Sequence, residues 1–392
     1  MARPKLRFKE FNGDWSLTSF QELFTFKNGV NATKEQYGSG IKFINVLDII
    51  NNPNGITYDS IIGSVNITSK EIDKNLVQYG DVLFQRSSET REEVGQSNVY
   101  LSDEPVVFGG FVIRGAAQKE YNPVFMNGLL KTDSLRDQIT QLSGGSTRFN
   151  IGQDSLNKVS AYLPFKEEQT KIASFLSVVD KKITQLTQKH ELLSQYKQGM
   201  MQKLFSQQIR FKTDDGSEFG EWEYKELDLL LDYEQPTKYI VSSTNYDNSF
   251  PIPVLTAGKT FILGYTNEEH GIFNAESQNV IIFDDFTTAY KFVNFNFKVK
   301  SSAMKILKTD PRKNNIFYLY STFSTLFLSL GDEHKRRWIS EYSKLEVPVP
   351  CLEEQTKIAN FLSVIDQKIR KVAQQIEETK QWKKGLLQQM FV

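Results

Sequence analysis

The sequence predicts an α+β protein in which two mixed α/β domains are joined by two long, antiparallel coiled-coil helices. First, residues 167–183 and 353–369 carry nearly the same helical sequence at a constant offset of 186 residues. Second, two arms, 6–15 and 209–222, resemble each other and each end in a tryptophan. Third, the blocks between arm and helix show no obvious similarity. The chain is therefore expected to be a pseudo-two-fold repeat of arm, variable block and helix.

Composition agrees with a folded protein of two or more domains. A chain of 392 residues is long for one hydrophobic core, and 39% hydrophobic residues are enough to build several. The formal net charge is zero, and the single cysteine, Cys351, excludes an internal disulfide. The first residues lack the apolar stretch of a signal peptide, and no apolar run is long enough to span a membrane. We expect a cytoplasmic protein.

The repeated helices have clear boundaries and a clear apolar seam. Each follows a proline, Pro164 or Pro350, and has two glutamates in its first turn, where they favour the positive helix end. Apolar residues then recur at alternating spacings of four and three, which is the pattern of a coiled coil. The seam positions are Ile172, Leu176, Val179, Ile183, Leu186, His190, Leu193, Lys197, Met200 and Leu204, and Ile358, Leu362, Ile365, Ile369, Val372, Ile376, Thr379, Lys383, Leu386 and Met390.

The chain path predicts that the two helices run antiparallel, because the first leads away from block one and the second leads back from block two. Gly199 and Gly385 occupy matched positions, and each costs about 1 kcal/mol in a helix interior. Their placement predicts close backbone approach, either between the helices or to a partner. The expected segments are 1–163 (arm and first domain), 164–207 (first helix), 208–349 (second arm and domain) and 350–392 (second helix).

The variable blocks are expected to be mixed α/β. Strand-like runs bounded by turn residues lie at 41–49, 80–86, 106–113, 279–285 and 294–300. Helical stretches are expected at 122–142 and 314–330.

Motifs for catalysis are incomplete. The segment 253–260 resembles a phosphate-binding loop, but Pro253 replaces the glycine that the loop needs. The three histidines are scattered and lack the spacing of metal ligands. The pair Asp284 and Asp285 fits either a metal site or a capped turn. The sequence therefore predicts no catalytic residue and no metal.

Binding is the function that remains. Arginine and hydroxyl side chains on loops are the usual contacts to base edges and phosphates. The segment 305–344 contains eight basic residues and four acidic ones. This excess of positive charge suits phosphate contacts, but equally a solvated charged face. The candidate DNA-binding residues are Arg86, Ser87, Arg91, Ser146, Thr147 and Arg148 in block one, and Thr287, Thr288, Lys291, Lys335, Arg336 and Arg337 in block two.

The arrangement resembles the DNA-sequence specificity subunits of type I restriction–modification systems. The resemblance covers the whole chain and is carried by two P-x-x-E-E-Q-T-K-I-A-x-F-L segments, at 164–176 and 350–362, by "YGDVLFQRSSETREEVGQS" at 79–97 and by "GGSTR" at 144–148. It implies two target-recognition domains that each read half of a split, asymmetric duplex DNA site. Block two has "DEHKRRW" where "GGSTR" is expected, so the DNA contacts of the two blocks need not correspond.

The resemblance also implies partners. The paired helices would dock two methyltransferase subunits and, through them, restriction subunits; the partners would use S-adenosylmethionine, ATP and magnesium, and this chain would bind no cofactor. Residues expected in the coiled coil or in docking are Glu168, Gln169, Ile172, Leu176, Ile183, Gly199, Glu354, Gln355, Ile358, Leu362, Ile369 and Gly385. A coiled-coil adaptor whose blocks bind proteins and no nucleic acid stays open as the alternative.

Overall fold

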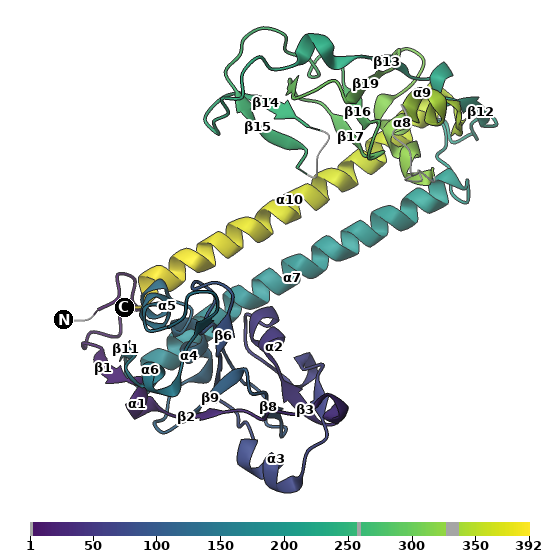
Figure 1. Ribbon diagram of the computed structural model, residues 1–392. Coiled ribbons are helices and arrows are strands. Elements are labelled where there is room, and N and C mark those ends of the chain that lie inside the picture. Colours follow the sequence, from purple (N-terminus) through teal and green to yellow (C-terminus); the bar gives the residue numbers. More distant parts are fainter. Residues whose placement is uncertain (1–2, 257–259, 327–336) are drawn as a thin grey trace. The chain divides into compact units, whose positions relative to one another are not determined.

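The computed structural model describes residues 3–256, 260–326 and 337–392 (Figure 1). They form two compact units, one of residues 1–188 and 373–392 and the other of residues 189–372. Each unit contains one arm, one block and part of both long helices, α7 (Lys166–Phe205) and α10 (Leu352–Met390). The long helices are thus shared between the units and are not segments of their own.

The first unit, which we call unit 1, contains four sheets, two of them two-stranded ribbons, and several short helices. A four-stranded sheet has the order β2-β9-β5-β7 and a three-stranded sheet the order β4-β3-β8. Two-stranded ribbons pair β1 with β11 and β6 with β10. The strands are β1 (Ser16–Ser19), β2 (Phe24–Asn28), β3 (Tyr37–Ile44), β4 (Ser64–Val65), β5 (Val82–Gln85), β6 (Ser87–Ser88), β7 (Ser97–Val99), β8 (Val107–Phe108), β9 (Val112–Ala117), β10 (Phe149–Asn150) and β11 (Ser160–Leu163). The helices are α1 (Phe20–Leu23), α2 (Val46–Asn51), α3 (Ser69–Asn75), α4 (Pro123–Leu129), α5 (Asp133–Gln141) and α6 (Gln153–Asn157).

The second unit, unit 2, has a four-stranded sheet of order β13-β19-β16-β17, a three-stranded sheet of order β15-β14-β18 and the ribbon β12-β20. The strands are β12 (Glu223–Glu226), β13 (Asp232–Glu234), β14 (Ile252–Leu255), β15 (Ile262–Thr266), β16 (Val280–Asp284), β17 (Tyr290–Val293), β18 (Lys298–Val299), β19 (Met304–Lys308) and β20 (Glu346–Val349). The helices are α8 (Ile316–Thr322) and α9 (Arg337–Ser340).

Most of the predicted elements are present, with four corrections. The run 106–113 is two strands, β8 and the start of β9, with a turn between them. The run 41–49 is not one strand: β3 ends at Ile44, and α2 begins two residues later because Asp48 accepts a hydrogen bond from the backbone of Asn45 at 2.7 Å. The run 294–300 forms only the short β18. The stretch 122–142 folds as two helices, α4 and α5, rather than one. Residues 327–330 of the second predicted helical stretch lie outside the described residues.

The long helices run antiparallel within each unit, as predicted. In unit 1, Asp180 near the start of α7 pairs with Lys383 near the end of α10 at 2.5 Å. In unit 2, Lys197 near the end of α7 pairs with Asp366 near the start of α10 at 2.6 Å. The second pair repeats the first at the offset of 186 residues. Both pairs place the start of one helix beside the end of the other, so the repeat recurs in the contacts.

The predicted seam is the buried side of both helices, but the two glycines do not mark a close approach between the helices, and close approach to a partner stays a prediction. Every seam position is buried or half-buried. An added Cβ at Gly199 or Gly385, in contrast, would meet no atom of the described chain within 4 Å. Neither glycine is required for close approach of the two helices. Among the described residues, no helix is long and apolar enough to cross a membrane.

Candidate nucleic-acid interface

Two loops of block one that the sequence singled out separately lie together in the structure. Strand β6 pairs with β10, which places Ser87 opposite Asn150. The Ser87 hydroxyl donates to Oδ1 of Asn150 at 2.6 Å, and the backbone N–H of Ile151 donates to the carbonyl of Arg86 at 3.0 Å. The end of β5 and the "GGSTR" loop therefore form one surface, which we call rim 1: Arg86, Ser87, Arg91, Ser146, Thr147 and Arg148.

Rim 1 depends on a tight glycine turn. Gly144 and Asn150 exchange two backbone hydrogen bonds, of 2.9 and 2.8 Å, which close the loop at its base. Gly145 has a φ of +124°, and an added Cβ would lie 2.1 Å from the carbonyl oxygen of Arg148. Only glycine fits there. The turn leaves Ser146, Thr147 and Arg148 exposed, so the loop presents its polar side chains outward.

The electrostatics of rim 1 favour hydrogen bonding over bulk charge. Arg86, Arg91 and Arg148 are exposed, and none of them forms an ion pair with a residue that the structure describes. Arg91 lies over the Phe149 ring, with 5.3 Å between guanidinium and ring centroid. Exposed glutamates at 89, 92 and 93 balance these positive charges. Such a surface suits readout of base edges, where arginine donates and glutamate accepts.

The corresponding turn of block two is built differently. Asp284 accepts from the backbone N–H of Phe286 at 2.9 Å and from the Thr287 hydroxyl. Asp285 accepts from the backbone N–H of Trp338 at 3.0 Å and pairs with Lys305 at 3.3 Å. The acidic pair is therefore a capped turn with a buried ion pair. No group of three or more metal-ligating side chains occurs in the described ranges.

The predicted contacts of block two are only partly available. Thr288 sits in the turn with a φ of +58° and is 7% exposed, so its predicted DNA contact is wrong. Thr287 and Lys291 are exposed. Lys335 and Arg336 lie outside the described residues, and so does the side chain of Arg337, although α9 begins there.

The basic stretch 305–344 is largely neutralised where it is described. Lys308 pairs with Glu234 at 2.8 Å, and Arg312 pairs with Asp310 at 2.9 Å. Lys344 pairs with Asp228 and Glu226, and Lys305 with Asp285. Trp338 is 1% exposed and stacks on Phe323 in the core, with 6.1 Å between ring centroids. These residues are structural, and the expectation of a phosphate-binding segment does not hold for them.

The second glutamate of each repeated E-E-Q motif binds the arm of its unit. In unit 1, Arg7 donates to both carboxylate oxygens of Glu168 at 2.7 Å each. In unit 2, Arg210 does the same to Glu354 at 3.1 and 2.7 Å, and the indole N–H of Trp222 adds a third hydrogen bond at 2.9 Å. Hydrogen bonding to the buried carboxylate raises the pKa of each arginine.

The glutamine of the same motif fastens the block. Gln169 accepts from the backbone N–H of Asn122 at 2.9 Å, and Gln355 accepts from that of Asn315 at 2.9 Å. Each asparagine is the N-cap of the next helix, α4 or α8. These glutamates and glutamines are buried and hold each unit together, so of the two roles expected for them, coiled coil or docking, their burial favours the internal one.

The seam residues of the same expected set lie inside the units, in agreement with the coiled-coil role predicted for them. Ile172, Leu176, Ile358 and Leu362 belong to the hydrophobic cores of their units. The outward sides of the helices instead carry exposed apolar residues at matched positions, Val178 with Val364 and Tyr196 with Trp382. Sequence reasoning missed them, although the same offset of 186 marks both pairs.

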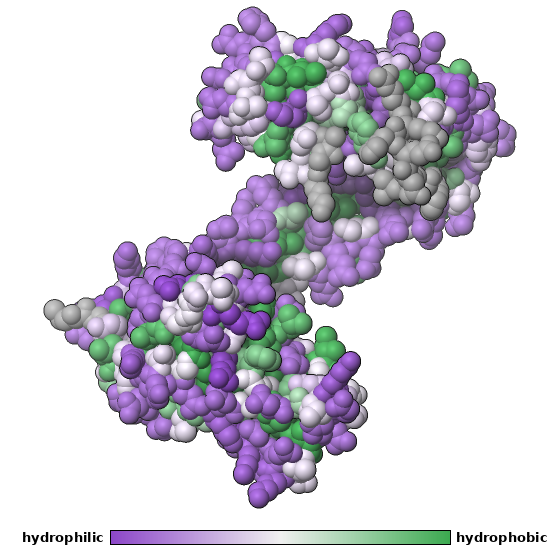
Figure 2. Space-filling model, viewed as in Figure 1, coloured by the Kyte–Doolittle hydropathy of each residue, from purple (hydrophilic) through white to green (hydrophobic). Residues whose placement is uncertain are grey.

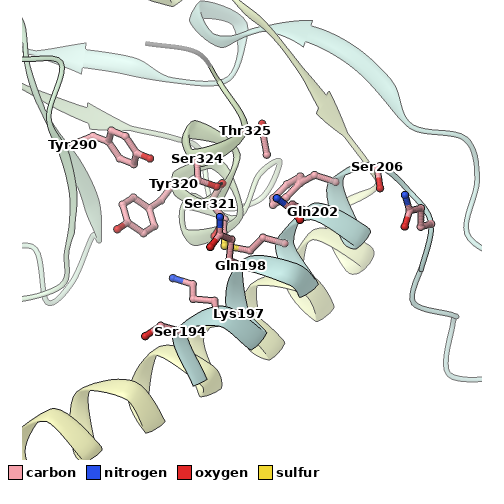
Figure 3. Close-up of a pocket in the computed structure, with 13 residues that line it drawn as sticks. Ser194, Lys197, Gln198, Gln202, Ser206, Tyr290, Tyr320, Ser321, Ser324 and Thr325 are labelled. Carbon is pink, nitrogen blue, oxygen red and sulfur yellow. The ribbon is translucent and has the colours of Figure 1, made fainter. Parts of the chain in front are cut away.

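Unit 2 has a cavity of about 840 Å³ beside the end of α7 (Figure 3). Ser194, Gln198 and Gln202, spaced by four on α7, and Ser206 just beyond its end face α8 and β17 across the cavity. The residues on the far wall are Tyr290, Tyr320, Ser321, Ser324 and Thr325.

The fold, the repeated scaffold and the exposed polar rim define a DNA-reading protein with an internal repeat. The family of type I restriction modification DNA specificity domains matches residues 12–194 and 220–381, one match for each repeat. The chain belongs to this family and is a DNA-sequence specificity subunit of a type I restriction–modification complex.

Individual relatives agree with this assignment. The chain is 52% identical over 139 residues to the EcoR124I/EcoR124II specificity subunit of Escherichia coli, a match that covers 35% of this chain and 34% of that protein. It is 24% identical over 412 residues to a putative type I restriction enzyme MjaX specificity subunit of Methanocaldococcus jannaschii, covering 96% and 93% of the two chains. The type I restriction-modification S subunit of M. genitalium has the same fold, with a TM-score of 0.62, 18% identity and coverage of 100% and 99%.

Proposed function

We propose that this chain reads a bipartite, asymmetric DNA target, with one half-site for each unit. The observation that carries the proposal is that a repeated scaffold supports two unlike surfaces: rim 1 in unit 1, and the turn after β16 in unit 2. A two-fold protein with identical halves would read a palindrome, because the symmetry of a site mirrors the symmetry of its reader. Rim 1 carries exposed arginines, whereas the matching turn of unit 2 carries a buried acidic pair. The two units therefore read different half-site sequences, which we call the first and second words of the target.

The repeated helices serve as the platform for partners. Two copies of one surface suit two copies of one partner, here two methyltransferase subunits, with restriction subunits bound through them. The matched exposed residues Val178 with Val364 and Tyr196 with Trp382 replace the buried E-E-Q residues as the docking positions. Aromatic residues are enriched in protein interfaces.

The chain itself is non-catalytic in this proposal. S-adenosylmethionine, ATP and magnesium belong to the partner subunits, which perform methylation and restriction. We assign the chain to the cytoplasm, where its DNA target and its partner subunits would meet. The proposal that the chain is non-catalytic is supported by the incomplete set of catalytic motifs in the sequence.

Methylome sequencing tests the proposal. A host that carries this chain with its modification partner is expected to show one methylated motif of two unlike words separated by an unread spacer. Binding to that site should weaken steeply with salt, because phosphate contacts release counterions. A host without a chain-dependent motif, together with salt-insensitive or absent DNA binding, would favour the adaptor function instead.

A further inference from the structure

Phe111 is an exposed aromatic residue at the edge of rim 1. It occupies the turn between β8 and β9 and is 65% exposed. Figure 2 shows mostly hydrophilic residues on the visible face of each unit, with apolar residues scattered among them. One exposed apolar side chain is therefore ordinary, and its position has to supply the argument.

The turn holds Phe111 rigidly. The backbone N–H groups of Gly109 and Gly110 donate to the carbonyls of Ile44 and Val30, at 3.0 and 2.9 Å. An added Cβ at Gly110 would lie 1.8 Å from Oδ1 of Asn31, so a larger residue there would require the Asn31 side chain to move. The backbone that carries the ring is thus held by hydrogen bonds, so binding through Phe111 would not have to order the turn.

The same turn holds Arg86. The backbone N–H of Arg86 donates to the carbonyl of Phe111 at 2.9 Å, and its guanidinium donates to the carbonyl of Gly110 at 3.4 Å. An apolar ring and a guanidinium therefore leave the rim side by side. Any groove that admits one side chain admits the other.

Unit 2 lacks this ring. In unit 1, Gln85 at the end of β5 pairs with Val112, which follows Phe111. In unit 2, Asp284 at the end of β16 pairs with Met304, which follows Ala303. Ala303 thus occupies the position of Phe111, and the exposed aromatic residue of this part of unit 2, Phe286 (51% exposed), lies instead on the turn after β16.

We propose that Phe111 contacts the C5-methyl group of a thymine next to the base pair that Arg86 reads, an inference that rests on the proposed function. Arginine pairs best with guanine O6 and N7 in the major groove. The thymine methyl group is the apolar group that base pairs present in that groove, so it is the matching partner for the adjacent ring. Phe111 is then a specificity-determining residue of the first half-site.

Deoxyuridine, which lacks only that methyl group, tests the contact. The complex of this chain with its modification partner is titrated with its methylome-defined site, and with duplexes in which each thymine of the first half-site is replaced in turn. One replacement should weaken binding by about fourfold, the equivalent of one buried methyl group (~0.8 kcal/mol). Phe111→Ala should weaken binding to the natural site at least as much, and should no longer respond to that replacement.

Leu17→Ala is the matched control, because Leu17 is also an exposed apolar residue (60%) but lies on the β1–β11 ribbon. The Leu17→Ala variant should bind the natural site, and lose affinity on the deoxyuridine replacement, as the unaltered chain does. The proposal is overturned if Phe111→Ala binds like the unaltered chain, if its effect adds to every deoxyuridine replacement, or if the first word contains no A·T pair. Failure of the unaltered complex to bind any bipartite site would instead refute the proposed function.

Discussion

Units 1 and 2 share a strand order that their sequences do not reveal. The four-stranded sheets β2-β9-β5-β7 and β13-β19-β16-β17 correspond strand for strand. So do the three-stranded sheets, in which β3 and β14 each pair antiparallel with one neighbour and parallel with the other. The blocks diverge at the strand ends. After β5 comes the exposed Arg86, whereas after β16 comes the buried Asp285.

The units differ again where the blocks meet the long helices. Unit 2 has its large cavity beside α7. In unit 1, Gly128 and Lys131 lie at the matching place beside α10: a Cβ at Gly128 would be 3.2 Å from Phe391, and Lys131 donates to Asn127 at 3.0 Å. Burial lowers the pKa of Lys131 to about 7. The arginine and glutamine contacts of the E-E-Q motifs and the ion pairs of the long helices are thus repeated, whereas the contacts at the cavity of unit 2 are not. Selection for one scaffold and two different targets would leave this pattern.

The largest effect is expected at the two glutamates that fasten the arms. Glu354→Ala leaves Arg210 and the Trp222 indole without their buried partner and should cost roughly 3–5 kcal/mol. Glu168→Ala should cost about 1 kcal/mol less, because Trp15 does not bond to Glu168 and one hydrogen bond fewer is lost. Urea unfolding followed by hydrogen exchange resolves the two units. Equal costs would show that the units are fastened identically.

The next effect concerns the rims. Arg86→Ala should lower DNA affinity by roughly thirtyfold, about 2 kcal/mol, and relax only the first word of the methylated motif. Arg3→Ala is the control, since Arg3 is an exposed arginine of unit 1 outside the rim that pairs with Asp14 at 2.6 Å. Competition binding and methylome sequencing measure both quantities. A change in the second word would mean that the units do not read independently.

Acid should affect the two units differently. The hydrogen bond from Lys298 lowers the pKa of Glu268 in unit 2 to about 2, whereas burial raises the pKa of Asp81 in unit 1. A lowered carboxyl pKa stabilises the fold above about pH 4.5, and this stabilisation is lost as the pH falls towards 2. Glu268→Gln should therefore cost about 1–2 kcal/mol at pH 7, after allowance for solvent screening, and almost nothing at pH 2. Asp81 acts oppositely, favouring unit 1 as the pH falls. Unfolding curves across this pH range give the comparison, and a constant cost would contradict it.

The smallest effect is expected at the repeated ion pairs. Asp180→Lys places two cations together and should cost roughly 1 kcal/mol, which Lys383→Asp should restore. The equivalent exchange of Asp366 and Lys197 should behave alike in unit 2. Thermal unfolding of the single and double variants measures the coupling. Failure of either double exchange to recover stability would show that the pair does not stabilise the helix register.

The sequence predicted what is local or repeated. The seam follows from spacing along one helix, and the internal repeat follows from comparison of two segments. The joining of Arg86 with the "GGSTR" loop depends on β6 pairing with β10 across about sixty residues, which spacing does not reveal. The phosphate-binding prediction for the basic stretch failed because acidic residues from distant parts of the block, such as Glu234 and Asp228, pair with its lysines.

The polar contacts that fasten each block to the repeated scaffold use mainly the backbone of the block. Gln169 and Gln355 accept from a backbone N–H, and the ribbons β1-β11 and β12-β20 are backbone ladders. Such contacts do not depend on which side chains the block carries. A block inherited from another gene by recombination would need a strand to join the ribbon, a capped helix start at the right place and apolar side chains that pack on the long helix. The chain can thus acquire a new word in one genetic exchange, without compensating changes in the platform.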